Sequence, residues 1–436
     1  MRIKRSWQAA GAAAVAAAVL AGCGHTAAAP APSVSVSVQQ VSAAPLASST
    51  EEQSATAAAT DAFGLDLYHA LTAQAGGQNL VVSPSGLSTL LAMLLPGAKG
   101  GTAQEMAAAL HTQLAPEQYA VSTGALDRAA RGQDPRLTVQ QSDTVWVQQG
   151  YPVRQEYLRV LAEAFNAGVR STDFAKDPEG ARKAVNALVE QQTNGQIKDL
   201  FAPGSMDPST LLALTDALYL KADWRTPFKH ESTSPQPFHQ LDGSATQVPT
   251  MEQHAGLRYA EGSGGITGQP WQAVELPYAG GNLAMDLLVP AQGGFDAFRK
   301  SLDAPQLDRI LKELMEHQVD LALPKFNFET GNDLSATLQS LGMKSAFGPT
   351  ADFSGIAGPN APGRVQISKV VQKAKIIVDE QGTTAAAGSG AVVGTSAQVA
   401  GSSEVQLHID RPFLFLIRDT QSGQPLFLGQ VTDPHG

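Results

Sequence analysis

One uncharged stretch near the C-terminus constrains the fold more than any other part of the sequence. Between Glu380 and Glu404 the chain carries neither a charge nor a proline. Its composition is that of a linker, yet it follows a strand-like run at residues 365–378 and precedes the strongly apolar residues 413–417. Because charge resists burial and proline removes a ladder hydrogen bond, this composition lets the stretch either lie exposed as a loop or enter the middle of a sheet.

The length and charge of the chain limit its class. The 436 residues, 43% of them hydrophobic, are enough for one large domain or two ordinary ones. A formal charge of −10 and an isoelectric point near 5.4 argue against a nucleic-acid-binding protein, which usually carries a basic stripe. We therefore expect a globular protein that binds no nucleic acid.

The N-terminus has the pattern of a bacterial lipoprotein signal. Three basic residues lie at positions 2, 4 and 5, an apolar run covers residues 9–20, and Leu-Ala-Gly-Cys at residues 20–23 resembles a lipobox. We expect residues 1–22 to be a removed signal peptide and Cys23, the only cysteine, to carry the lipid. The alternative is an ordinary secretion signal that happens to contain a cysteine.

Removal of this signal makes the chain more acidic. It takes away three basic and no acidic residues, so the formal charge falls from −10 to about −13 and acyl chains must provide the anchor. We expect secretion across the cytoplasmic membrane and lipid anchoring on its outer side, at the cell surface or in the periplasm. Residues 23–59 are poor in large apolar side chains and are predicted to be a disordered tether, which leaves residues 60–436 as the folded domain.

Helices and strands are mixed along that domain. Apolar residues recur every four positions at Phe63, Leu67 and Leu71, which indicates a helix that ends at Gly76-Gly77. Asp177-Pro178 has the pattern of a helix start. Further helices are predicted at 302–315 and 334–347, and strands at 137–148, 211–220, 274–278, 284–290 and 319–328. Without regular βαβ alternation, this order predicts an α+β fold.

The sequence does not indicate catalysis. It lacks a Gly-x-Ser-x-Gly elbow, a His-Glu-x-x-His pair, a Walker loop and a cysteine nucleophile, and its nine histidines have no ligand spacing. We therefore expect neither an enzyme nor a cofactor or metal requirement. One residue stands out, because Asp216 lies within the apolar run 211–220 and a buried carboxylate needs distant hydrogen-bond donors.

Residues 79–102 read as a short strand, Ser-Pro, an apolar helix and a glycine-rich turn, and residues 213–224 approximate the pattern Asn-Ala-x-Tyr-Phe-Lys-Gly-x-Trp. Both segments are similar to serpin motifs, and from about Thr60 to Pro434 the chain resembles a serpin. The match continues in order at residues 323–326, 341–343, 351–356, 370–374, 379–387, 411–417 and 426–431. The resemblance implies a single domain with three β-sheets, surrounded by about eight or nine helices, and an exposed reactive loop.

The same resemblance implies inhibition of a serine protease by a suicide-substrate mechanism. The protease cuts the loop, the severed loop inserts into the central sheet as a new strand, and the acyl-linked protease is trapped covalently. The inhibitor is expected to be a monomer. A non-inhibitory serpin that serves as a surface binding module is the alternative, as is an inhibitor of papain-like cysteine proteases.

The uncharged stretch then supplies the hinge and the reactive bond. By resemblance Glu380 should pair with Lys325 near Trp224 and hold the uncut loop out of the sheet. The inhibitory spacing from Glu380 places the reactive bond at Ser396-Ala397. The hinge residues are Glu380, Gly382, Thr383, Thr384, Ala385, Ala386 and Ala387, and the alternatives for the bond are Thr395, Gln398 and Val399.

The count from the strand at Pro412 back to the bond points nearer to Gly401, so the loop is a few residues longer than in common serpins. Small or neutral side chains near the bond favour elastase-like or subtilisin-like targets.

The chain departs from the family pattern at residues that lie under the central sheet in serpins. It has Asp216 where serpins usually have asparagine, Gln372 where they have histidine, and Gly86 in place of a common serine. These positions, with Ser83, control the opening of the sheet in the family. We expect the Gln372 amide to donate a hydrogen bond to Asp216, which would supply the distant donor that a buried Asp216 carboxylate requires.

Overall fold

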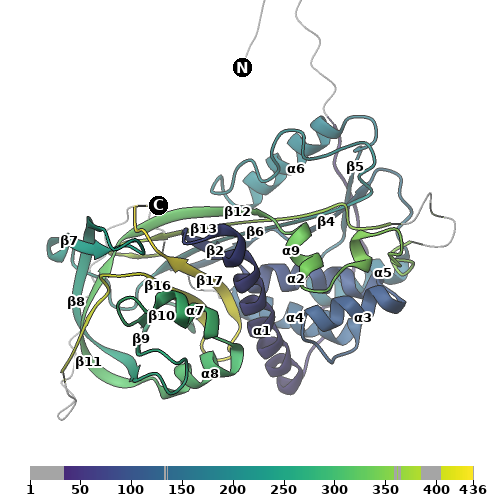
Figure 1. Ribbon diagram of the computed structural model, residues 1–436. Coiled ribbons are helices and arrows are strands. Elements are labelled where there is room, and N and C mark those ends of the chain that lie inside the picture. Colours follow the sequence, from purple (N-terminus) through teal and green to yellow (C-terminus); the bar gives the residue numbers. More distant parts are fainter. Residues whose placement is uncertain are drawn as a thin grey trace, which may run out of the picture. The chain divides into compact units, whose positions relative to one another are not determined.

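Two extended sheets and the helices that pack on them make up the structure (Figure 1). The computed structural model describes residues 34–131, 134, 136–357, 361, 365–383 and 404–435, which belong to one compact unit. The α-helices are α1 (Thr50–Ala75), α2 (Pro84–Leu94), α3 (Gly100–Ala109), α4 (Pro116–Ala130), α5 (Gln155–Phe165), α6 (Pro178–Gln192), α7 (Phe295–Ser301), α8 (Ala304–Glu313) and α9 (Ser335–Ser340).

The first sheet has eight strands and carries the candidate site. Its order is β1-β5-β4-β6-β14-β13-β12, and β3 also pairs with β6. At its centre β6 and β13 run parallel and pair directly from Lys369↔Ala213 to Lys375↔Tyr219. The strands are β1 (Ser37–Gln39), β3 (Leu137–Gln141), β4 (Thr144–Gln148), β5 (Val169–Thr172), β6 (Leu212–Asp223), β12 (Phe326–Asp333), β13 (Lys369–Val378) and β14 (Gly382–Thr383).

The second sheet has nine strands in the described residues. Its order is β15-β11-β8-β9-β10-β16-β17-β2, with β7 on β8. The strands are β2 (Leu80–Val82), β7 (Ser234–His239), β8 (Ala245–Gly262), β9 (Trp271–Pro277), β10 (Leu283–Pro290), β11 (Met315–Pro324), β15 (Glu404–His408), β16 (Phe413–Asp419) and β17 (Pro425–Val431). Strand β8 pairs with β11 along one edge and with both β7 and β9 along the other, so the three expected sheets are hydrogen-bonded into two. The predicted α+β class is confirmed.

Side chains on β6 alternate between two environments, as a strand covered on both faces requires. Leu212 and Leu214 pack into the core under the sheet, together with helices α1, α2 and α5. Ala213 and Ala217 face the opposite side and pack with α6. In Figure 1 α6 accordingly lies on one side of the sheet and α1 to α5 lie on the other. Farther along, Leu218 and Leu220 join the core between the two sheets.

The N-terminal boundary of the folded part differs from the sequence-based one. Helix α1 begins at Thr50, where Ser49 and Glu52 form a reciprocal capping box, and Ala57 and Ala59 are buried in the body of the protein. Strand β1 pairs with β5 still earlier in the chain. The tether predicted up to residue 59 is therefore corrected for residues 34–59. Alanine-rich sequence forms a helix here because its small side chains pack closely against α4.

Three predicted elements are broken at polar positions. The strand expected at 137–148 is two strands, β3 and β4, separated at Ser142-Asp143. The strand expected at 319–328 is also two, and the chain changes sheets between β11 and β12 at Lys325. The helix expected at 334–347 stops at Ser340, just before Gly342 takes a positive φ of 109°. Local periodicity did not reveal these breaks, because tertiary pairing decides them.

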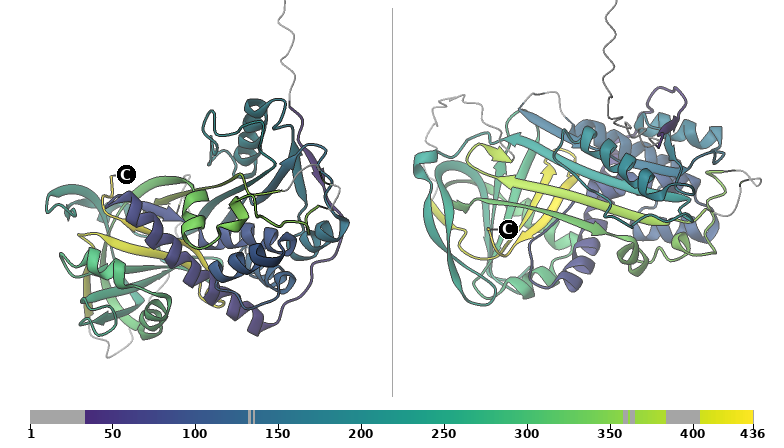
Figure 2. Two further views of the ribbon diagram at one scale, coloured as in Figure 1. Left: turned by 45° about the vertical axis from the view of Figure 1, so that its right-hand side comes forward. Right: turned by 90° about the horizontal axis from the view of Figure 1, so that it is seen from above.

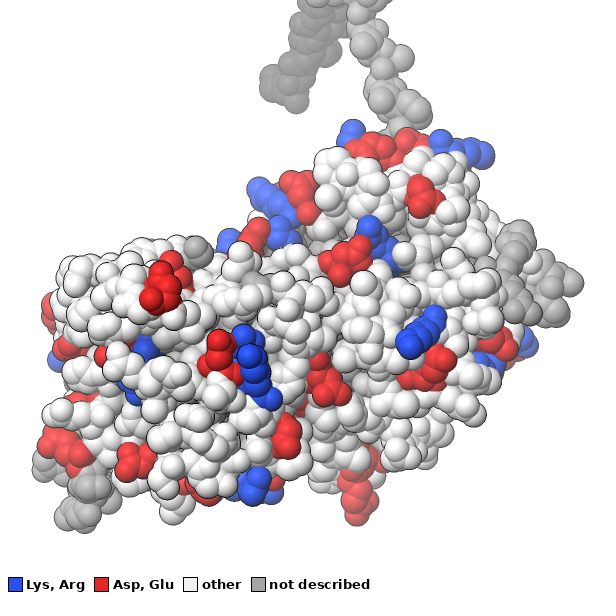
Figure 3. All heavy atoms as spheres, in the orientation of Figure 1, with Lys and Arg blue, Asp and Glu red and all other residues white. Residues whose placement is uncertain are grey.

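The surface carries both signs of charge. Figure 3 shows Lys and Arg beside Asp and Glu on the displayed face, with wide uncharged areas between the pairs. Ion pairs such as Lys312–Asp308 and Lys373–Glu329 account for part of this pattern. In the part of the chain that the structure describes, no helix combines the length and the apolar character needed to span a bilayer.

Candidate functional site

The site lies at the end of the eight-stranded sheet where the uncharged stretch begins. After β13 the chain reverses in a tight turn, in which the Asp379 amide donates to the Gly382 carbonyl at 3.0 Å. Gly382 and Thr383 then enter between β6 and β13 as the short strand β14, which is antiparallel to both neighbours. The right-hand view in Figure 2, taken from above, shows the long strands of this sheet side by side. Two residues of the stretch are therefore already inserted in the sheet.

Gly382 is required by close packing of the backbone. A Cβ atom at this position would lie 2.0 Å from the Ala222 carbonyl oxygen and 2.8 Å from the Asp223 Cα. Both contacts are with backbone atoms of β6, which cannot move aside without loss of the ladder. Only glycine allows β14 to approach β6 this closely.

Trp224 holds the turn in place. Its backbone amide donates to the Gln381 carbonyl at 2.7 Å, and its indole Nε1 donates to the Asp379 carbonyl at 2.9 Å. The indole ring also stacks on Tyr278, with ring centroids 4.6 Å apart and planes 7° apart. The Tyr278 hydroxyl in turn shares a hydrogen bond of 2.5 Å with the Thr383 hydroxyl. The stacked pair thus links the body of the protein to both ends of the turn.

Glu380 makes the strongest polar contacts of the turn. Its carboxylate accepts from Lys325 Nζ at 2.7 Å and from the Thr233 hydroxyl at 2.8 Å, and His230 Nδ1 lies at 3.1 Å. The side chain is only 7% exposed. Burial opposes ionisation of Glu380, but the hydrogen bonds from Lys325, the backbone and Thr233, with the Lys325 charge, outweigh it and lower the pKa to about 2. The structure thus brings together Glu380 and Lys325, near Trp224, as the resemblance implied.

A second polar group lies beneath the centre of the same sheet. Gln372 Nε2 donates to Asp216 Oδ2 at 2.6 Å and to the Ser83 carbonyl at 2.8 Å, while the Ser83 amide donates to Gln372 Oε1 at 3.1 Å. All three residues are buried. The hydroxyl of Ser83 caps helix α2 by accepting from the Gly86 amide at 2.9 Å. One glutamine amide therefore ties β13 to β6 and to the start of α2, and the hydrogen bond expected between Gln372 and Asp216 is present.

Gly86 and Asp216 depend on each other. A Cβ atom on Gly86 would lie 2.5 Å from Asp216 Oδ2 and 2.6 Å from Oδ1. A serine at this position would therefore collide with the carboxylate. The glycine makes room for the acid, so these two departures from the family pattern are structurally coupled.

Asp143 is the site residue that sequence reasoning missed. The pairing of β3 and β4 with β6 places it across from Asp216, in the gap between the two strands. Burial, then the negative charges of Asp216 and Asp127, and a hydrogen bond to Asp216 raise the pKa of Asp143 well above its ordinary value. Burial also raises the pKa of Asp216, although hydrogen bonds from Gln372 and Asp143 oppose the rise. A hydrogen bond between two carboxyl groups needs a proton on one of them, and the direction of the two shifts favours Asp143 as its donor.

The sequence carried a signal for this pair. Asp143 is the one acid in the strand-like run 137–148, as Asp216 is in the run 211–220. Two acids in two otherwise uncharged strands become partners once the strands pair. The Oδ1 atoms of both acids are buried and have no hydrogen-bond partner among the described residues.

Several predicted site residues lie outside the described residues. They are the remaining hinge positions Thr384, Ala385, Ala386 and Ala387, the predicted reactive bond Ser396-Ala397 with its alternatives Thr395, Gln398 and Val399, and Cys23. Their roles stay predictions. The described part of the hinge is Glu380, Gly382 and Thr383.

Comparison with known proteins gives one family. A family model described as "Serpin (serine protease inhibitor)" matches residues 58–434. An uncharacterised serpin-like protein of Thermococcus kodakarensis is 36% identical over 380 residues, which are 86% of this chain and 85% of that protein. Leukocyte elastase inhibitor of Bos taurus is 33% identical over 386 residues, 86% of this chain and 99% of the relative. The solved structure of native protease nexin-1 with heparin has a TM-score of 0.78 at 26% identity, covering 88% of this chain and 100% of that one.

Proposed function

Because this chain belongs to the serpin family, whose model is described as a serine protease inhibitor, we propose that it traps a serine protease covalently as a suicide substrate. The observation that carries the proposal is strand β14. Gly382 and Thr383 already occupy the space between β6 and β13 at one end of the sheet. The residues that follow them are small and uncharged from Thr384 to Ala387, as a strand that enters a filled sheet requires.

The strand order makes insertion of the loop energetically favourable. Strands β6 and β13 are parallel neighbours, and β14 is antiparallel to both. A continued β14 replaces one parallel ladder by two antiparallel ladders, which are slightly more stable per residue. With about ten inserted residues and roughly 1 kcal/mol net per hydrogen bond, on the order of 10 kcal/mol is released. That energy is comparable to what a protease active site contributes to catalysis, so it suffices to deform the site.

The contacts of Glu380 and of Gln372 oppose insertion before cleavage. The Glu380–Lys325 ion pair fixes the turn that precedes β14. Gln372 and Asp216 are direct partners across the β6–β13 ladder, which an inserting strand must separate. In this proposal both contacts keep the uncut loop exposed to the protease.

The side chains near the predicted bond favour a target class. Thr395, Ser396, Ala397, Gln398 and Val399 are small or neutral, so the proposed targets are elastase-like or subtilisin-like serine proteases. The similarity to leukocyte elastase inhibitor supports this class. Papain-like cysteine proteases are the alternative target.

The N-terminal pattern gives the proposed location. Lipidation of Cys23 after removal of residues 1–22 would anchor the inhibitor on the outer side of the cytoplasmic membrane. There it would meet proteases outside the cell or in the periplasm. Labelling with a radioactive fatty acid, with Cys23→Ala as the unlabelled control, tests the anchor.

The test of inhibition is a complex that survives SDS. The chain is mixed with an elastase-like and a subtilisin-like protease, and the expected product is a covalent complex, with a released C-terminal peptide whose mass locates the cut bond. A Thr384→Arg variant places a charge in the hinge and should be cut at the same bond without forming the complex. Simple cleavage of the unaltered chain by every protease, without a complex and without a gain in Tm after cleavage, would refute inhibition and favour a non-inhibitory binding module.

A further inference from the structure

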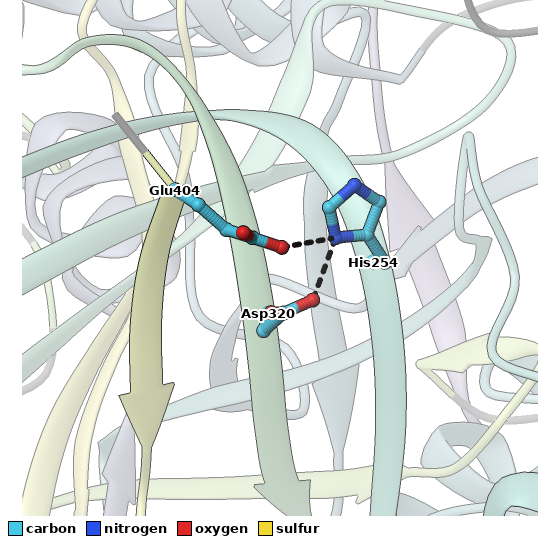
Figure 4. A group of neighbouring side chains, drawn as sticks. All are labelled: His254, Asp320 and Glu404. Atoms are coloured by element: carbon cyan, nitrogen blue, oxygen red, sulfur yellow. Dashed lines mark hydrogen bonds and ion pairs between the residues drawn. The ribbon is translucent and has the colours of Figure 1, made fainter. Parts of the chain in front are cut away.

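Three side chains of types that can bind a metal ion meet on the surface of the nine-stranded sheet. They are His254 on β8, Asp320 on β11 and Glu404 on β15, and one ligand atom of each lies within 4.8 Å of the other two. His254 Nδ1 is 2.6 Å from Asp320 Oδ1 and 4.0 Å from Glu404 Oε1. Figure 4 shows both carboxylates directed at this one imidazole nitrogen.

The sheet fixes this arrangement through its register. His254 and Asp320 are direct cross-strand partners, so their side chains project from the same face. Glu404 pairs with Gln318, two residues before Asp320, and therefore projects from that face as well. Because three neighbouring strands supply the three side chains, the backbone already brings the ligand atoms together and only side-chain rotation remains.

The set of donors has the chemistry of a transition-metal site. An imidazole nitrogen with two carboxylate oxygens suits Zn²⁺ and similar ions, whereas Ca²⁺ and Mg²⁺ prefer oxygen ligands alone. Metal–ligand bonds of about 2.0–2.2 Å require donor atoms roughly 3–3.5 Å apart in a tetrahedral site. The distance from His254 Nδ1 to Asp320 Oδ1, 2.6 Å, is shorter than that spacing, and the distance from His254 Nδ1 to Glu404 Oε1, 4.0 Å, is longer. We propose that His254, Asp320 and Glu404 bind one divalent transition-metal ion, with Zn²⁺ as the best match and water completing its coordination.

The site is open to solvent and can adjust. The side chains of His254, Asp320 and Glu404 are 55%, 37% and 66% exposed. An ion therefore reaches the site directly, and the Glu404 side chain can rotate to close the 4.0 Å gap.

The position of Glu404 connects the metal to the reactive loop. Glu404 begins strand β15, which follows the uncharged stretch and, among the described strands, pairs with β11 alone. A metal held by all three residues joins this edge strand to β11 and β8 and so fixes the C-terminal end of the loop. This second part rests on the proposed function, and it predicts that Zn²⁺ changes the rate at which the chain forms a complex with its protease.

Titration of the full chain with Zn²⁺ alone at pH 7.5 tests the site. The expected result is saturable binding of one ion and a higher Tm. His254→Ala and Glu404→Gln should each weaken binding at least about tenfold. His408→Ala, an exposed histidine on the same strand as Glu404, should leave it unchanged. No binding up to about 1 mM Zn²⁺, or equal binding by the His254→Ala variant, would overturn the proposal.

The two parts of the inference fail separately. If Zn²⁺ binds as expected but does not alter the rate of complex formation, the site stands and its coupling to the loop is refuted. If no protease is inhibited at all, the titration still decides the metal site, because neither its readout nor its variants involve a protease.

Discussion

Replacement of Gln372 by leucine tests the polar group under the sheet most directly. Leucine has nearly the volume of glutamine but neither its donors nor its acceptor, so the change removes hydrogen bonds with little steric effect. The Gln372 amide donates to Asp216 and to the Ser83 carbonyl, and accepts from the Ser83 amide. The leucine variant leaves the buried Ser83 amide and Asp216 Oδ2 unpaired and out of reach of water, whereas the Ser83 carbonyl keeps its hydrogen bond from the Leu87 amide.

The expected loss of stability follows from that count. An unsatisfied buried group costs about 1–3 kcal/mol, and the Asp216 carboxylate lies at the upper end because it is charged. Two such groups, one of them at about 3 kcal/mol, give a loss of roughly 4–6 kcal/mol, which lowers Tm by several degrees in a chain of this length. Loss of the donor also raises the pKa of Asp216 further, so the deficit should be larger at pH 8 than at pH 5, where the neutral acid needs no donor.

Urea unfolding at both pH values, with Tm at one fixed scan rate, measures this effect. Gln140→Leu on β3 of the same sheet is the matched control, because Gln140 Oε1 has no hydrogen-bond partner in the described part of the chain. That variant should stay within about 0.5 kcal/mol of the unaltered protein. If Gln372→Leu unfolds at the same urea concentration as the unaltered protein at both pH values, the reasoning about this group is wrong.

Three further changes test the rest of the site. The pKa of Glu380 is lowered to about 2, so its contribution to the free energy of unfolding is present above pH about 4.5 and is lost as pH falls towards 2. Glu380→Gln should lower the free energy of unfolding by about 1–3 kcal/mol at pH 7. Below pH 4.5, the urea midpoint of the variant should no longer show the loss of stability caused by protonation of Glu380. Asp143 and Asp216 have raised pKa values, so the unaltered protein should lose stability as pH rises above about 4. Asp143→Asn keeps a hydrogen-bond donor but has no titrating proton, so its free energy of unfolding should depend less on pH. An equal pH dependence in the variant and the unaltered protein would exclude a shared proton. Gly382→Ala should expel β14 from the sheet, and we expect faster hydrogen exchange of the Thr383 amide, whereas unchanged protection would contradict the required close approach.

Much of the central sheet and part of the site could be predicted from sequence. The apolar run around Asp216 is a strand buried on both faces, and the need of a buried acid for a donor pointed correctly to a distant partner. The approach of Lys325 to Glu380 came from family resemblance alone, because nothing in the local sequence links residues 55 positions apart.

The remainder depended on tertiary pairing. Asp143 meets Asp216 only because of the register in which β3 and β4 pair with β6. From periodicity alone, Asp143 is only a polar residue within one predicted strand. The prediction of a disordered tether up to residue 59 was wrong at the start of α1 for a similar reason. Alanine-rich sequence has a high helix propensity but little to bury, and the choice between helix and disorder is made by contacts such as the hydrogen bond from the Thr56 hydroxyl to Ser122. The cluster of His254, Asp320 and Glu404 likewise joins three distant parts of the chain.

Because strand β14 already separates β6 from β13 at one end, the central sheet can open progressively from that end. Progressive opening breaks the hydrogen bonds of one register pair at each step, so each step costs far less than separation of the whole ladder at once. Gly382 and Thr383 part β6 from β13 at one end, and the registered pairs from Lys375↔Tyr219 to Lys369↔Ala213 lie ahead of them. In the proposed insertion, each further residue of the stretch would separate one pair at a time. The pair that resists separation most would then set the barrier to opening the sheet, and we expect it to be the buried pair of Gln372 and Asp216.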